Sequence, residues 1–119
     1  MSAPTDTTGP LATFSSKIPM LWPDVAPFCA ATGIDGETEV ETLRAAVVHR
    51  RAGDPTDAAR RPGDELEALL AGWAHFDAER RAVLRGAVRY LQEQGDRCRS
   101  GCEEHLVDAA VLAVLRSRG

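Results

Sequence analysis

A chain of 119 residues supplies enough material for one hydrophobic core. Its 18 acidic residues outnumber its 14 basic residues, whereas a nucleic-acid-binding domain normally carries a basic excess, so nucleic acid is not the expected partner. No apolar stretch approaches the roughly 20 residues that span a bilayer, and the N-terminus lacks the features of a signal peptide, so no membrane role is expected.

The remaining composition indicates a helical protein from a reducing compartment. Ala and Leu are abundant, which favours helix over strand. Three cysteines are an odd, low count that differs from a secreted disulfide scaffold, so we expect a cytoplasmic protein with reduced thiols. Lys17 is the only lysine, and a basic complement made almost entirely of Arg is typical of a bacterial genome of high GC content.

The N-terminal third is expected to be the least regular part of the chain. Residues 1–10 combine Pro, Gly, Ser and Thr with little to bury, which predicts a disordered tail before a single helical domain over 11–119. Pro19, Pro23 and Pro27 interrupt the next segment, so only a short helix near 23–32 is expected there. The apolar side chains of this arm either cover the protein's own core or dock a partner.

Four longer helices follow, and together with the short N-terminal helix they predict an all-α, single-domain bundle. Apolar spacing and capping residues place them at about 37–52, 64–75, 77–94 and 101–117. The polar segment over 53–63 is expected to form a long loop.

The last of these helices is apolar on nearly every side. A helix with so wide an apolar surface is either central in a bundle or shared with another subunit. We therefore expect a protein partner or a homodimer to contact this helix. The predicted interface residues are Leu106, Val107, Val111, Val114 and Leu115.

Three side chains with reactive or metal-binding chemistry lie within eight residues at the start of that helix. They are Cys98, Cys102 and His105. Two thiolates and an imidazole suit Zn²⁺, which normally takes four ligands. Alternatively, a thiol in the first turn of a helix has a lowered pKa and suits redox sensing. The third interpretation is that these residues serve only as ordinary packing and surface positions.

A second group could form a ligand pocket between the second and third long helices. It comprises Trp73, His75 and Tyr90. Aromatic residues at such a junction also pack the corner between helices without binding anything. The sequence contains no nucleophile elbow, phosphate-binding loop or metalloprotease motif.

Part of the C-terminal half resembles the YkvA-like family of small helical bacterial proteins. The similar segments are Leu84–Leu91 and Leu106–Leu115, in which Asp108 matches one of the family's paired aspartates. Because that family has no established activity, the resemblance implies a helical fold and no mechanism.

These observations favour a non-enzymatic helical module for protein–protein interaction or regulation that self-associates. The alternative function is a metal- or thiol-based sensor that uses Cys98, Cys102 and His105, with zinc as the possible cofactor.

Overall fold

Helices make up all the regular secondary structure of the described residues in the computed structural model, which are 9–30, 36–53, 57–94 and 100–115. In chain order the elements are α1 (Pro10–Lys17), α2 (Trp22–Val25), the 3-10 helix η2 (Ala26–Cys29), α3 (Gly36–Gly53), α4 (Asp57–Leu70), the 3-10 helix η3 (Trp73–His75), α5 (Ala78–Gln94) and α6 (Ser100–Leu115). The all-α class expected from the sequence is confirmed. The predicted set of four main helices with one short N-terminal helix is only partly matched.

The N-terminal arm is more helical than expected. Pro10, predicted to lie in a disordered tail, is buried at the start of α1, where a proline fits because the first helical N–H groups have no acceptor. The single short helix expected near 23–32 is instead α2 followed by η2. Since Pro27 has no N–H, it cannot donate the α-helical bond to the carbonyl of Pro23.

The long helices lie near their predicted positions, except at the two ends of α4. Helix α4 begins at Asp57 rather than at residue 64, so most of the expected loop over 53–63 is helical. Ala58, Ala59, Arg60 and Arg61 are strong helix formers, which favours helix before Pro62. Their preference alone does not offset the cost of a proline beyond the first turn, which is about 3 kcal/mol. The predicted end at residue 75 is also wrong, because α4 stops at Leu70 and residues 73–75 form η3.

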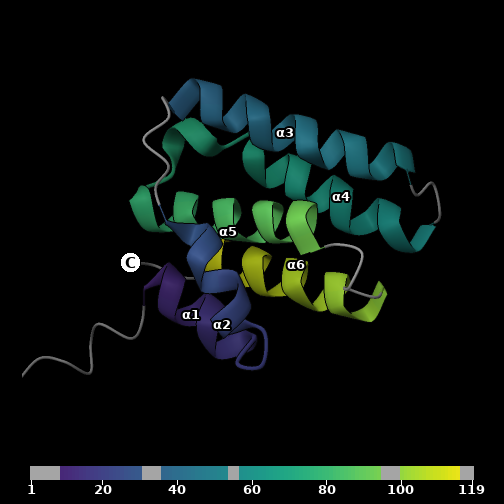
Figure 1. The fold of residues 1–119 in the computed structure, drawn as a ribbon. Coiled ribbons are helices and arrows are strands. Elements are labelled where there is room, and N and C mark those ends of the chain that lie inside the picture. The colour runs from purple at the N-terminus through teal and green to yellow at the C-terminus, as the bar shows by residue number, and fades with distance from the viewer. Residues whose placement is uncertain (1–8, 31–35, 54–56, 95–99, 116–119) are drawn as a thin grey trace, which may run out of the picture.

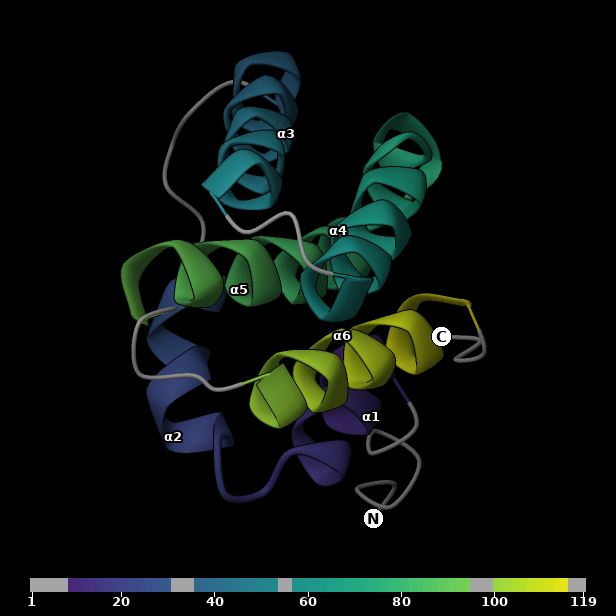
Figure 2. The same cartoon turned by 90° about the vertical axis from the view of Figure 1, so that its right-hand side faces the viewer.

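Helix α5 is the central element of the fold. Helices α3 and α4 lie on one side of it, and α1, α2 and α6 lie on the other (Figures 1 and 2). Its residues 82–88, 90 and 91 are all buried. Asp77 starts this helix as predicted, because its carboxylate accepts the backbone N–H of Arg80 at 2.9 Å.

A buried ion pair joins three elements around the middle of α5. The Nε and Nη2 atoms of Arg85 both donate to the carboxylate of Glu39 in α3, the second at 3.0 Å. Its Nη1 donates to the carbonyl of Cys29 at the end of η2, at 2.8 Å. Because all three acceptors are buried, this guanidinium connects the N-terminal arm and α3 to the central helix.

The N-terminal arm belongs to the core. Phe14 and Ile18 are almost fully buried, and the Phe14 ring meets the Trp22 ring edge-on at a centroid distance of 6.0 Å. Helix α1 packs on both α5 and α6. Of the two interpretations of this arm, the structure supports the one in which it covers the protein's own core.

Candidate functional site

Helix α6 turns one stripe of side chains towards solvent. Leu106, Val107, Ala109, Ala110, Ala113 and Val114 are buried against α1, α4 and α5. Among the residues 104–115, whose exposure is described, the accessible side chains follow helical spacing, and they are Glu104, His105, Asp108, Val111, Leu112 and Leu115. The N-terminal half of this solvent stripe is therefore polar and its C-terminal half is aliphatic.

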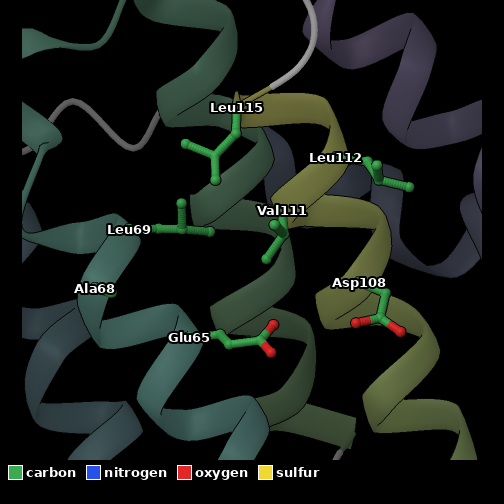
Figure 3. A pocket seen from close by; sticks show the side chains of 7 residues that line it. All are labelled: Glu65, Ala68, Leu69, Asp108, Val111, Leu112 and Leu115. Atoms are coloured by element: carbon green, nitrogen blue, oxygen red, sulfur yellow. The ribbon is translucent and has the colours of Figure 1, made fainter.

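The aliphatic half borders an open groove of about 490 Å³ between α4 and α6. Glu65, Ala68 and Leu69 line it from α4, and Asp108, Val111, Leu112 and Leu115 line it from α6. Figure 3 shows the carboxylates of Glu65 and Asp108 at one end and the side chains of Leu69, Val111 and Leu115 towards the other. The groove is thus apolar along its length and acidic at one end.

The walls of the groove are held together by the direct packing of α4 on α6. Both helices run from the acidic end of the groove to the aliphatic end (Figure 3), and each also contacts α5. Leu69 is buried and forms the floor of the groove. On the α4 side the groove is shallow, because Ala68 has a small side chain.

Arg80 anchors the aliphatic end of α6. Its Nε donates to the carbonyl of Val114 at 3.0 Å, and its Nη1 lies 2.8 Å from a carboxylate oxygen of Asp77. The last carbonyls of a helix lack intrahelical partners, so this bond satisfies one of them. It also fixes Leu115, the next residue, at the edge of the groove, where 64% of its surface is exposed.

The predicted interface residues fall into two groups. Leu106, Val107 and Val114 lie in the core of the same chain, so they are not available to a partner on this folded surface. Val111 and Leu115 line the groove. The sequence prediction omitted Leu112, Asp108 and the α4 wall.

The cysteine–histidine cluster lies largely outside the described residues. Cys98 is not among them, and Cys102 belongs to α6 without a described side chain. His105 is exposed on the solvent stripe. Among the side chains that the structure does describe, no group of three or more potential metal ligands is present. The metal and redox interpretations of this cluster stay predictions.

The structure does not bring Trp73, His75 and Tyr90 together around one cavity. Trp73 is buried, with the guanidinium of Arg81 5.3 Å from its ring centroid. His75 is exposed. Tyr90 lies nine residues beyond Arg81 on α5, about 13 Å along the axis, and its ring meets Phe28 edge-on at 6.2 Å. The aromatic side chains of this proposed pocket therefore pack in two separate places.

Comparison with known proteins adds no relative. No family model, no curated protein and no solved structure matches the chain. The resemblance to the YkvA-like family accordingly stays a prediction. Within the described ranges, no helix has the combination of length and apolar character that crossing a membrane requires.

Proposed function

We propose that this chain is a non-enzymatic helical module that binds a protein partner in the groove between α4 and α6. The observation that carries the proposal is the aliphatic half of the solvent stripe, in which Val111, Leu112 and Leu115 border one continuous groove. Leu115 stands at its edge with most of its surface exposed. Accessible aliphatic side chains with polar neighbours at the rim are typical of protein interaction sites.

The shape of the groove favours a macromolecule over a small ligand. Pockets for small molecules bury most of the ligand surface, whereas this groove is open along its length between two helices. Two parallel helices with an apolar floor offer the geometry in which a third helix docks. The site is therefore better suited to recognition of a helix than to enclosing a substrate.

Self-association was expected because α6 is apolar on nearly every side. Most of that surface now has an intramolecular explanation, since α1, α4 and α5 cover it. The accessible part, bordered by Val111, Leu112 and Leu115, is where either a second copy or another protein would bind. Both occupants are compatible with an interaction module, and the experiment below separates them.

A displayed library of amphipathic helical peptides tests the proposal. We expect the wild-type protein to enrich binders whose affinity falls at least tenfold in Leu115→Glu. Met20→Glu is the matched control, because Met20 is 89% exposed and lies outside the groove. Sedimentation velocity on the same proteins measures self-association. If no peptide binding and no oligomer depends on Leu115, the groove is not an interaction site.

The sensor remains the alternative function and rests on the spacing of Cys98, Cys102 and His105 in the sequence. Metal analysis of protein purified without chelators, combined with thiol titration, tests it. One metal per chain that is lost in Cys102→Ser would replace the interaction module as the leading function. Metal-free protein whose thiols do not form a reversible disulfide would remove the sensor.

A further inference from the structure

We infer that the occupant of the groove is an amphipathic helix of another protein whose apolar stripe ends in Arg or Lys. This inference rests on the proposed function and specifies the chemistry of the partner. The apolar stripe would lie along Leu69, Val111 and Leu115, and the basic side chain would lie beside Asp108 at the acidic end.

The partner needs an apolar stripe with a basic end because the groove is acidic at one end and aliphatic at the other. Along α6, Asp108, Val111, Leu112 and Leu115 follow the spacing of one helical face. A helix lying alongside α6 therefore meets a carboxylate first and aliphatic side chains over the next two turns. A partner helix matches this surface when one end of its stripe is cationic and the rest is apolar.

The acidic end has a charge that a basic partner would neutralise. Asp108 and Glu104 are exposed and four residues apart, so they lie one above the other on α6 and repel. The formal net charge of the chain is −4, which also favours the approach of a basic segment.

A second copy of the chain fits the described surface less well. A two-fold axis along the groove would place the acidic end of one copy against the acidic end of the other. An axis perpendicular to the groove would place Asp108 of one copy against Leu115 of its partner, which removes a carboxylate from water without a cation.

Two displayed peptide libraries test the charge requirement. Both contain 18-residue amphipathic helices with randomised aliphatic residues on one stripe, and they differ only in a final stripe position that is Arg or Lys in one and Glu or Asp in the other. We expect the basic library to supply the Leu115-dependent binders, with about fivefold higher affinity than their acidic counterparts at low salt. High salt should reduce this preference because it screens exposed charges.

Variants of the acidic end complete the test. Asp108→Asn should reduce the preference for basic peptides, and Asp108→Arg should reverse it, whereas Asp24→Asn, at an exposed carboxylate on α2, should leave it unchanged. Leu115-dependent binding that ignores peptide charge would overturn this inference and leave the proposed function intact. A dimer that dissociates in Leu115→Glu would also overturn it, because a second copy would then occupy the groove. Absence of any Leu115-dependent binding or oligomer would reject the proposed function, and this inference with it.

Discussion

At the residue scale, Gly86 allows the N-terminal arm to approach the central helix closely. A Cβ atom at this position would lie less than 3.0 Å from the Sγ of Cys29 and 3.5 Å from a methyl group of Val25. We therefore expect Gly86→Ala to destabilise the protein by about 1 kcal/mol, because overpacking outweighs the better helix propensity of Ala. Urea denaturation monitored by circular dichroism measures this difference in the free energy of unfolding.

Because the overlap would involve the sulfur of Cys29, a second substitution at Cys29 should restore the stability lost in Gly86→Ala. Removing the sulfur in Cys29→Ala should make Gly86→Ala nearly neutral or stabilising when the two substitutions are combined, since Ala at position 86 then gains helix propensity without the overlap. If Gly86→Ala is as stable as the wild type, or if Cys29→Ala provides no rescue, the close approach of η2 and α5 is not what requires glycine here.

Burial also determines the reactivity of Cys29. Desolvation raises the pKa of its thiol to about 11 from an ordinary value of 9.0, although the nearby Arg85 guanidinium acts in the opposite direction. At pH 8 the thiolate is therefore about a hundredfold scarcer than for an exposed cysteine. In a Cys98→Ser/Cys102→Ser background we expect iodoacetamide to modify the native protein at a correspondingly low rate at pH 8.

The pH dependence has a defined direction. Because the pKa in the folded state is raised, the contribution of Cys29 to stability is complete below pH 9 and decreases as the pH rises towards 11. Comparison with Cys29→Ala over this range isolates the effect from other groups. Rapid alkylation of the native protein at pH 8, at the rate of the unfolded chain, would show that the thiol is neither buried nor perturbed.

At the element scale, the pair of Arg85 and Glu39 determines how α3 and η2 are placed on α5. Arg85→Met would leave a buried carboxylate and the carbonyl of Cys29 without their donor. We expect this substitution to cost about 3–5 kcal/mol. Chemical denaturation measures the change, and Arg44→Met, at an exposed position on α3, should change stability by less than about 0.5 kcal/mol.

A double-mutant cycle separates the pair from its surroundings. Combining Arg85→Met with Glu39→Gln should cost clearly less than the sum of the two single substitutions, because the second removes the buried charge that the first leaves uncompensated. Additive losses would mean that the two side chains contribute independently, contrary to the hydrogen bonds that join them.

Helical periodicity in the sequence predicted the elements better than their boundaries. In α3, for example, Val40, Leu43 and Val47 recur at the i, i+3 and i+7 spacing of one helical face, and that face packs on the core. Pro62 and Gly63 were interpreted as loop residues because both disfavour a helix interior, yet α4 runs through them and Gly63 is buried. Helix α1 was missed because its short apolar pattern has little stability without the packing of Phe14 and Ile18.

The candidate groove was only partly predictable for a related reason. Helix α6 is apolar around most of its circumference, so its sequence does not show which stripe faces solvent. Asp108 and Glu104 are the one local signal, since charged residues one turn apart point away from a core. Following their spacing forward leads to Val111, Leu112 and Leu115, but only the tertiary structure places Leu69 beside them.

In the whole molecule, the central helix of the bundle is α5 and not α6. The wide apolar face of α6 suggested a central or shared helix, yet α5 is the one that is surrounded on both sides (Figure 1). The sequence did not indicate that α5 is central, because arginines are usually exposed and Arg85 is buried in the middle of this helix. Helix α6 instead lies between α1 and α4, which leaves one stripe accessible.

This arrangement makes the N-terminal arm an obligatory layer of the fold. Phe14 is fully buried where α1 covers α5 and α6, so Phe14→Ala should reduce the free energy of unfolding by about 3–5 kcal/mol. Thermal denaturation measures the loss, and Met20→Ala, in the exposed turn after α1, should have almost no effect. If α1 instead docks as a dispensable segment, Phe14→Ala would leave the main unfolding transition unchanged and release only the arm, which hydrogen exchange resolved along the chain would detect.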